Sequence, residues 1–248
     1  MKILGIVGSP RKGSSTDQLV THILEGAKSK GAEVEKLYLR DYNISHCQGA
    51  QSCEAVGKCV IPDDMELIVE KLREATGFVL GSPVLMDDIH PLLIDIINRS
   101  RQFGMLIDNL ILKTPAIEKT LAEEVERRTC YQLWKGTSYE KLPSPVEDII
   151  FNGLNEYEAK HGSEHPSGLR SRQGWREKKG VLALCYWQHG QDRYQLLVDH
   201  WKWVFEQYEN MKELDAVVAS RVGIKAHLKG MDDVMERAFK AGQWLCED

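Results

Sequence analysis

Residues 1–16 constrain the fold more than any other part of the chain. The apolar run 2–7 predicts a buried parallel strand, and it leads directly into Gly8-Ser-Pro-Arg-Lys-Gly-Ser-Ser-Thr16. This turn is rich in glycine, hydroxyls and cations, and it opens a predicted helix. Backbone N–H groups at a helix N-terminus, together with the helix dipole, favour an anion. The segment therefore predicts a phosphate-binding turn; an ordinary turn whose hydroxyls only cap the helix is the alternative.

The glycine spacing excludes two common phosphate sites. A nucleoside-triphosphate loop needs Lys after its second glycine, but Ser14 follows Gly13. The dinucleotide fingerprint needs three glycines as G-x-G-x-x-G, which Gly5, Gly8 and Gly13 do not match. What remains is a single terminal phosphate held by hydroxyls and backbone.

Apolar runs alternate with amphipathic segments, which predicts a parallel sheet covered by helices on both faces. We expect strands at 2–7, 33–39, 77–81, 180–187 and 214–220, and helices near 15–30, 63–75, 89–103, 192–208 and 231–245. This count fits an α/β chain with the flavodoxin-like doubly wound fold and its five-stranded parallel sheet. Its ligand lies beyond the carboxyl ends of the strands, where the strand order reverses.

Residues 105–178, between the third helix and the fourth strand, are too long for a crossover loop. We interpret them as a helical and loop insertion within a single flavodoxin-like domain over residues 1–248. The polar stretch 161–179, rich in chain-breaking residues, predicts an exposed or interface loop. The insertion is also a candidate dimer or tetramer element.

Composition limits the kinds of binding partner and the cellular compartment that we expect for this chain. The net charge of −5 gives no basic field for nucleic acid, and 42% hydrophobic residues suffice for a large core. The chain enters a strand at once, without a signal peptide, and no apolar run reaches membrane-spanning length. We expect a cytoplasmic protein that binds neither nucleic acid nor a membrane. In that reducing compartment, clustered cysteines indicate metal or redox chemistry.

Three segments together resemble one known family. They are Gly8-Ser-Pro-Arg-Lys12, then Cys47-x5-Cys53-x5-Cys59-Val-Ile-Pro-Asp63, then Gly81-Ser-Pro-Val84 before a helix ending Asn98-Arg99. In this order and spacing the chain resembles the flavodoxin-like NAD(P)H-dependent FMN reductases, and within them the iron-sulfur flavoproteins. The resemblance covers residues 1–104 well and 178–248 loosely, where His189-Gly-Gln-Asp192 is similar to the family's Gly-Gly-Gln-Glu turn.

The resemblance implies a bound FMN with NAD(P)H as the reductant. The residues implied to hold the FMN phosphate are Ser9, Arg11, Ser15 and Thr16, and those implied to run beside the isoalloxazine ring are Ser82, Pro83, Val84 and Leu85. A phosphate dianion beside an arginine and a helix N-terminus gains charge-assisted hydrogen bonds. The candidate cofactor-binding residues also include Ser14, Met86 and His189.

Leu85-Met-Asp-Asp88 departs from the family, which usually has an aromatic residue after Gly-Ser-Pro-Val. Carboxylates at Asp87 and Asp88 would disfavour flavin reduction if they pointed at the ring. We expect one of them instead to cap a helix that starts near Ile89. Tyr186-Trp187 ends the fourth strand, where an aromatic side chain either flanks the flavin or the substrate, or packs in the core.

The cysteine segment is similar to the family motif C-x2-C-x2-C-x5-C, which binds a [4Fe-4S] cluster. Ala50 stands at the second position, so the candidate metal ligands are Cys47, Cys53 and Cys59. Three thiolates do not complete a four-iron cluster. A cluster would need one iron without a protein ligand, or His46, an acidic residue or a cysteine from elsewhere in the chain as its fourth ligand. The favoured alternative is a loop without a cluster, packed by its small sulfur side chains.

We therefore predict an FMN-dependent oxidoreductase that passes reducing equivalents from NAD(P)H through FMN to a small-molecule electron acceptor, such as a quinone, a metal complex or a small organic molecule. One alternative is an iron-sulfur flavoprotein that exchanges electrons with a ferredoxin-like partner; another is a non-catalytic flavodoxin-like binding module. We expect a homodimer or homotetramer. No catalytic acid or base is identified, because the cofactor supplies the chemistry; Arg99 and His189 are candidate pocket groups.

Overall fold

The computed structural model describes residues 1–49, 59, 61–100, 175, 178–187, 192–208, 211–222, 228 and 230–247. The chain divides into two compact units, one formed by residues 1–44, 64–98 and 175–248, the other by residues 45–63 and 99–174. The first unit contains the parallel sheet and the helices that cover it. Most of the predicted insertion, residues 105–178, lies outside the described residues, and a single domain stays a prediction.

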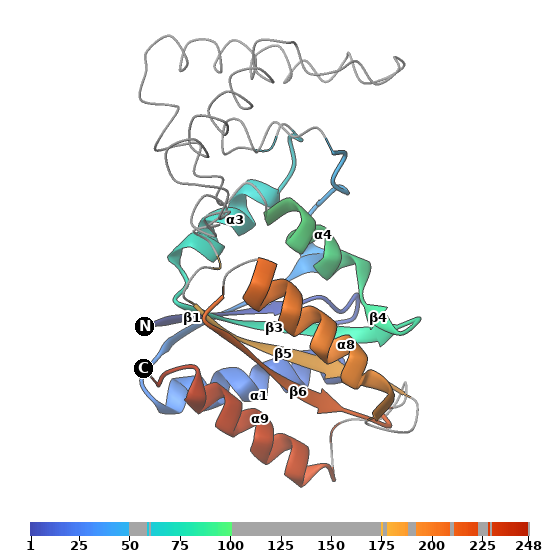
Figure 1. Ribbon diagram of the computed structural model, residues 1–248. Helices are drawn as coiled ribbons and strands as arrows, with labels where there is room; N and C mark the ends of the chain where they lie inside the picture. The colour runs from blue at the N-terminus through green and yellow to red at the C-terminus, as the bar shows by residue number, and fades with distance from the viewer. Residues whose placement is uncertain are drawn as a thin grey trace, which may run out of the picture. The chain divides into compact units, whose positions relative to one another are not determined.

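Five parallel strands form the sheet, in the order β2-β1-β3-β5-β6 (Figure 1). Their bounds are β1 (Lys2–Val7), β2 (Glu33–Tyr38), β3 (Gly77–Leu85), β5 (Lys179–Cys185) and β6 (Glu213–Ala219). The chain moves outward from β1 to β2 and then crosses to β3 on the other side, so the strand order reverses between β1 and β3. This is the predicted flavodoxin-like doubly wound fold.

Helices cover both faces of the sheet, because its central strands are apolar on both sides. On one face lie α1 (Ser15–Ser29) and α9 (Asp232–Trp244), and on the other lie α3 (Met65–Glu74), α4 (Pro91–Arg99) and α8 (Asp192–Trp203) (Figure 1). A short 3-10 helix, η1 (Leu39–Asp41), follows β2, and a π-helical turn, η4 (Val204–Tyr208), extends α8. The predicted helix 192–208 is therefore present, but its winding changes after Trp203.

Aromatic side chains fill the core beneath α8. Trp175 is fully buried, with its ring 4.6 Å from that of Phe78 and 5.4 Å from that of Phe205, both in edge-to-face geometry. The expectation of an exposed loop over 161–179 is therefore wrong at Trp175, because a single aromatic anchor outweighs its polar neighbours. Next to it, Lys178 donates from Nζ to the carbonyl oxygen of Leu72 at 3.0 Å, and burial lowers the pKa of Lys178 to about 8.

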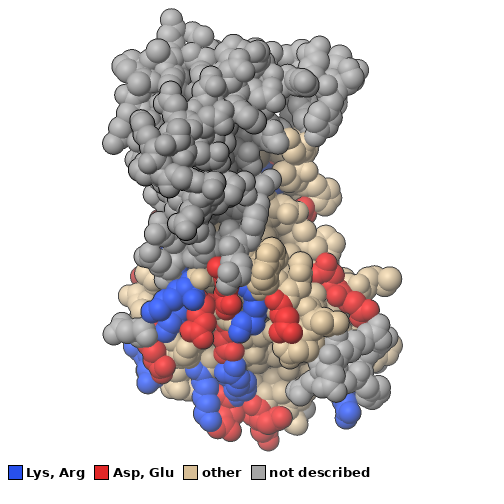
Figure 2. All heavy atoms as spheres, in the orientation of Figure 1, with Lys and Arg blue, Asp and Glu red and all other residues tan. Residues whose placement is uncertain are grey.

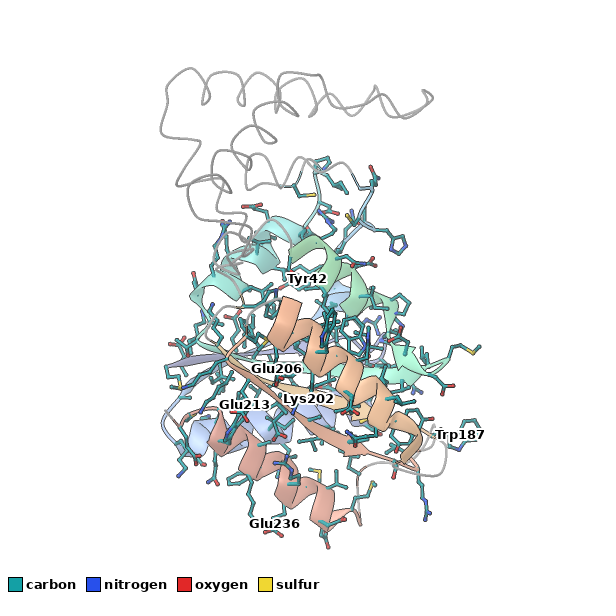
Figure 3. All side chains as sticks on the ribbon, in the orientation of Figure 1. Tyr42, Trp187, Lys202, Glu206, Glu213 and Glu236 are labelled. Atoms are coloured by element: carbon teal, nitrogen blue, oxygen red, sulfur yellow. The ribbon has the colours of Figure 1, made fainter. Side chains whose placement is uncertain are left out.

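The edge strand β6 has two amides covered by carboxylates. Leu214 donates its N–H to Glu206 Oε1 at 2.9 Å, and Ala216 donates to Asp215 Oδ1 at 2.8 Å. Glu206 belongs to η4, which packs beside β6 (Figure 3). Covered amides make an edge strand a poor template for pairing with another chain.

A cavity of about 330 Å³ lies along this edge between α8 and α9, and none of the predicted cofactor-binding residues line it.

Charged side chains of both signs are mixed on the face shown in Figure 2. On α9, Lys240 pairs with Glu236 at 2.5 Å, and Arg237 pairs with Asp215 of β6 at 2.6 Å. Among the described residues, no helix is long and apolar enough to cross a membrane.

The contact between α1 and α9 depends on two glycines. A Cβ on Gly242 would lie 1.8 Å from the carbonyl oxygen of Ile23, and one on Gly26 would lie 2.1 Å from that of Phe239. Both clashes involve backbone atoms, so no side chain can rotate away to relieve them. The two helices therefore pack backbone against backbone on this face of the sheet.

We expect Gly242→Ala to destabilise the fold by roughly 2 kcal/mol or more. Helix propensity alone would make this substitution stabilising by about 1 kcal/mol, so the sign of the change tests the close contact. The measurement is the urea midpoint of unfolding. The control, Lys240→Ala on the exposed side of α9, should stay within about 0.5 kcal/mol of the wild type; a more stable Gly242→Ala variant would contradict the packing.

Candidate functional site

The candidate site begins where β1 ends beside Gly81 of β3. Gly8 donates its N–H to the carbonyl oxygen of Gly81 at 2.8 Å, directly after the last pair of the two strands. A Cβ on Gly8 would lie 2.9 Å from that oxygen, and one on Gly81 would lie 2.3 Å from Cγ2 of Val20 in α1. Side chains do not fit at either position. Both predicted loops, residues 9–16 and 82–88, start from this pair.

The loop over residues 9–16 brings its hydroxyls together at the N-terminus of α1. Ser9 Oγ accepts the Arg11 N–H at 3.2 Å and the Ser14 hydroxyl at 3.0 Å, and Ser14 is the N-cap of α1. Gly13 has a φ of +69°, which allows the loop to turn into the helix. Within the described residues, no hydrogen bond is recorded for the amides of Ser14 and Thr16. These hydroxyls and amides are donors suited to a phosphate.

Arg11 supplies the loop with a cation. Its side chain is exposed, and no ion pair is recorded for it among the described residues, whereas Lys12 pairs with Asp41 at 2.5 Å. Arg11 thus adds an exposed cationic side chain to the loop that precedes α1. Ser9, Arg11 and Ser14 lie before the helix, and Ser15 and Thr16 begin α1. That these five residues hold a phosphate stays a prediction.

Thr16 has a second contact. Its buried side chain hydrogen-bonds Cys185 at the end of β5. Burial raises the pKa of the Cys185 thiol to about 12, so this cysteine stays protonated. The bond ties the start of α1 to the carboxyl end of the fourth parallel strand. A phosphate at α1 would thus meet the amide of Thr16 rather than its hydroxyl.

Sequence reasoning missed Asp17, whose buried side chain stabilises the same loop through hydrogen bonds. Its Oδ2 accepts the Gly13 N–H at 2.7 Å, and its Oδ1 accepts Lys36 Nζ at 2.7 Å and the Tyr38 hydroxyl at 3.1 Å. Burial alone would raise the pKa of Asp17, but the hydrogen bonds from Lys36 and Gly13 outweigh burial and lower it. Acids are common in the first turn of a helix, so no local pattern distinguishes Asp17 from an ordinary helix-start acid.

The second loop is a hairpin rather than a helix start. β3 runs on to Leu85 and pairs antiparallel with the two-residue strand β4 (Asp88–Ile89). Met86 and Asp87 form the turn with φ values of 52° and 61°. The expectation that Asp87 or Asp88 caps a helix near Ile89 is therefore wrong. Two successive residues of positive φ match the twist of a tight hairpin, and α4 begins only at Pro91.

Internal hydrogen bonds use the polar side chains of this hairpin. Ser82 is fully buried; its Oγ accepts the His90 N–H at 2.7 Å and donates to the carbonyl oxygen of Pro83 at 2.9 Å. Asp88 Oδ1 accepts the Ile89 N–H at 2.7 Å and Trp201 Nε1 at 3.1 Å. The Asp88 carboxylate is thus bound to α8.

The remaining ring-side candidates differ in exposure. Pro83 and Val84 are half-buried, Leu85 is 50% exposed and Met86 is 99% exposed. They follow one another from the end of the buried part of β3. His189 lies outside the described residues.

The cysteine segment belongs to the second unit, where Arg99 organises it. Arg99 Nη1 donates to Asp63 Oδ2 at 2.5 Å and to the carbonyl oxygen of Ser45 at 3.1 Å, and its Nη2 donates to Cys59 Sγ at 3.3 Å. Burial opposes the charged form of Arg99, but Asp63 and Cys59 outweigh burial and raise the pKa of Arg99. Arg99 Nε is buried without a partner among the described residues. Arg99 is thus a buried anchor and not an open pocket group.

The candidate metal ligands do not form a complete set. Cys47 is exposed, Cys59 is half-buried, and Cys53 lies outside the described residues. Ala50 stands where the family motif has its second cysteine, so this segment offers three of the four thiolates that a [4Fe-4S] cluster takes. Within the described part of the chain, no group of three or more His, Cys, Asp or Glu side chains is placed to bind a metal ion. The residues of this segment do not fit a four-cysteine cluster.

Residues 1–112, which contain both loops, match the family model of the NADPH-dependent FMN reductases. This part of the chain is similar to that family. An iron-sulfur flavoprotein of Methanocaldococcus jannaschii is 40% identical over 101 residues, covering 41% of this chain and 52% of the relative. One of Methanosarcina thermophila is 37% identical over 100 residues, covering 40% and 52%. The chain therefore spans about half the length of these curated relatives.

Solved structures of this FMN reductase fold resemble the whole chain. An FMN-dependent NADH-azoreductase from Bacillus anthracis aligns with a TM-score of 0.57 at 11% identity, covering 100% of both chains. An NAD(P)H:quinone oxidoreductase from Methanothermobacter marburgensis aligns with a TM-score of 0.55 at 11% identity, covering 100% of this chain and 98% of that one. At this identity the likeness shows the fold alone.

We expect Lys36→Met to destabilise the protein at pH 7 by roughly 2–3 kcal/mol, because it leaves the buried Asp17 carboxylate unpaired. The folded pKa of Asp17 is lowered from its ordinary 3.8, so its stabilising pair with Lys36 is complete above about pH 5 and is lost as the pH falls. The difference in unfolding free energy between wild type and variant should therefore shrink towards pH 3. Urea unfolding across this range measures it.

The double variant Asp17→Asn/Lys36→Met is the matched control, because it removes both charges. It should recover part of the stability at pH 7 and lose the pH dependence. A Lys36→Met variant as stable as the wild type at pH 7 would contradict the ion pair.

Proposed function

We propose that the chain binds FMN with its phosphate in the loop of residues 9–16 and acts as an FMN-dependent oxidoreductase. The observation that carries this proposal is the pair of Ser9 and Ser14 hydroxyls at the N-terminus of α1, with the exposed side chain of Arg11 in the same loop. The family match over residues 1–112 supports it independently. When bound, FMN supplies one- and two-electron chemistry, while the protein binds and orients it.

In this proposal, NAD(P)H is the electron donor and a quinone, metal complex or other small organic molecule is the acceptor. Each part of the site has its own task. Arg11 and the Ser14 amide hold the phosphate, Asp17 fixes the loop through Gly13, and the hairpin 82–88 runs beside the ring. Asp88 is bound to Trp201, so its carboxylate is held at α8. We also propose that the protein is a homodimer or homotetramer.

A second candidate function follows from the relatives. Those of Methanocaldococcus jannaschii and Methanosarcina thermophila are named iron-sulfur flavoproteins, which favours electron exchange with a ferredoxin-like protein. Against this, Ala50 replaces one cysteine of the compact motif. Reduced nicotinamide therefore remains the preferred electron donor.

A visible spectrum of protein purified without oxygen tests the proposal. Two resolved flavin bands that bleach on addition of NADH or NADPH support the oxidoreductase. Broad additional absorbance, with iron and sulfide found by analysis, favours the second candidate. A colourless protein that stays colourless after incubation with FMN would exclude both and leave a non-catalytic binding module.

We expect Arg11→Ala to weaken FMN binding about 10- to 100-fold, because it removes charge-assisted hydrogen bonds to the phosphate. Binding of riboflavin, which has no phosphate, should change less than about twofold. Equilibrium titration monitored by flavin fluorescence measures both affinities. Lys12→Ala is the matched control, since Lys12 already pairs with Asp41; equal losses for Arg11→Ala and Lys12→Ala would refute the role of Arg11.

A further inference from the structure

His90 stands between the hairpin 82–88 and α4, which follows β4 directly (Figure 1). Its carbonyl oxygen accepts the N–H groups of Leu93 at 2.8 Å and Ile94 at 3.3 Å. Its imidazole Nδ1 accepts the N–H of Leu92 at 3.2 Å. A side chain that takes an amide of the first turn, where the helix itself supplies no partner, is a helix N-cap. Pro91, at the first helical position, has no N–H to satisfy, so His90 is the cap of α4.

This cap requires a neutral imidazole. Because the Leu92 amide is the donor, Nδ1 must present a lone pair, and the ring proton of the neutral form lies on Nε2. A protonated imidazole carries N–H on both nitrogens and accepts no hydrogen bond. His90 is half-buried, and burial lowers its pKa from the ordinary 6.5. The usual caps Ser, Thr and Asn do not titrate, so His90 gives α4 a cap that depends on pH.

Burial, rather than an ion pair, shifts the titration of this group. Among the described residues, His90 takes part in no ion pair, and burial is the cause of its lowered pKa. The charged or titratable side chains on the surrounding elements are those of Asp87 and Asp88 in the hairpin, Asp95 and Arg99 in α4, Arg11 and Lys12 in the loop of residues 9–16, and His200 and Lys202 in α8. Asp88 is hydrogen-bonded to Trp201 of α8. Protonation of His90 therefore gains no ion pair in this arrangement and removes the cap.

The backbone of His90 also closes the hairpin. Its N–H donates to Ser82 Oγ at 2.7 Å, and the Ser82 hydroxyl donates in turn to the carbonyl oxygen of Pro83 at 2.9 Å. Ser82 is fully buried, where an unpaired hydroxyl would be costly. The first turn of α4 and the base of the hairpin are therefore joined at one residue.

The first turn of α4 also lies against the start of the loop of residues 9–16. A Cβ on Gly8 would lie 3.2 Å from Cβ of Leu93, which is fully buried. Gly8 in turn donates its N–H to the carbonyl oxygen of Gly81, one residue before the hairpin. Both loops of the candidate site therefore begin or end beside the turn that His90 caps.

We propose that His90 is a positioning residue of the flavin site, and that flavin binding weakens when His90 is protonated. This rests on the proposed function, in which the loop of residues 9–16 holds the phosphate and the hairpin 82–88 runs beside the ring. The neutral imidazole caps α4 and fixes the turn beside which both loops lie. A protonated imidazole directs an N–H towards the Leu92 N–H, so the cap is lost and the turn frays.

Titration of riboflavin into the full chain between about pH 7.5 and about pH 5, monitored by flavin fluorescence, tests this proposal. Riboflavin is the probe because the phosphate of FMN itself titrates at about pH 6. Loss of an N-cap changes an equilibrium roughly 2- to 30-fold, and we expect the affinity of the wild type to fall about 3- to 10-fold over this range. His90→Asn, whose amide caps a helix without titrating, should bind like the wild type at the upper pH and keep its affinity at the lower pH.

Urea unfolding at the same pH values measures the cap without a ligand. The pKa of His90 is lower in the folded chain than the ordinary 6.5, so the unfolded chain binds the proton more tightly. Stability is therefore unaffected at high pH and falls as the pH decreases below about 6.5. The urea midpoint of the wild type should fall relative to that of His90→Asn. His90→Ala, which has no cap at any pH, should bind riboflavin about 3- to 10-fold more weakly than the wild type at the upper pH.

His22→Asn is the matched control, because His22 lies on α1 and pairs with Glu25 at 2.8 Å. This variant should keep the wild-type pH dependence of riboflavin binding. Identical pH profiles of the wild type and His90→Asn would overturn the proposal. It would also fail if His90→Asn raised the urea midpoint at the lower pH without preserving riboflavin affinity, since His90 would then cap α4 without positioning the site.

Two further outcomes separate this inference from the proposed function. A wild-type chain that binds neither FMN nor riboflavin at the upper pH would overturn both. If Arg11→Ala loses FMN selectively while the wild type and His90→Asn lose riboflavin in parallel as the pH falls, only this inference fails.

Discussion

The meeting of Gly8 and Gly81 is the constraint on which the rest of the candidate site depends. Their hydrogen bond joins the end of β1 to the middle of β3, and the missing side chain of Gly81 lets α1 pack directly on β3. The loop of residues 9–16 and the hairpin 82–88 therefore start from one point. Thr16 adds β5 through Cys185, so segments from three adjacent strands meet across about 10 Å.

This geometry creates an electrostatic conflict that Lys36 resolves. In the proposed function, the phosphate site has a buried carboxylate, Asp17, in the first turn of its helix, where it would repel the ligand. The carboxylate takes the Gly13 N–H and thereby fixes the loop, and Lys36 neutralises it at 2.7 Å. With that charge paired inside the protein, the helix dipole and Arg11 determine the sign of the potential at the mouth of the loop. In this proposed site, Asp17 thus makes the loop rigid, and Arg11 provides the attraction for the anion.

Sequence reasoning succeeded where one local pattern decides the structure. Continuous apolar runs identified the five parallel strands, and the hydroxyl-rich turn after Val7 identified the start of α1. Sequence reasoning failed where contacts between residues far apart in the chain determine the local structure. Met86-Asp87 contains no glycine or asparagine that would indicate a hairpin with positive φ, and the polar neighbours of Trp175 conceal a ring that packs against Phe78. The partners of Asp17 lie on another strand, so no local pattern contains them.

Apart from Ala50 in the cysteine segment, the departures from the family lie at the proposed ring end of the site, and this division has a physical basis. The phosphate end binds the part of the ligand that does no chemistry, so its donors are constrained by one unchanging group. In the proposed function, Leu85–Asp88 form the ring end, where an electron donor and an acceptor approach. There the chain presents Met86, which is 99% exposed, and Leu85, which is 50% exposed. Apolar side chains at this end would favour flat, weakly hydrated acceptors over small ionic ones, because covering them releases water from both surfaces.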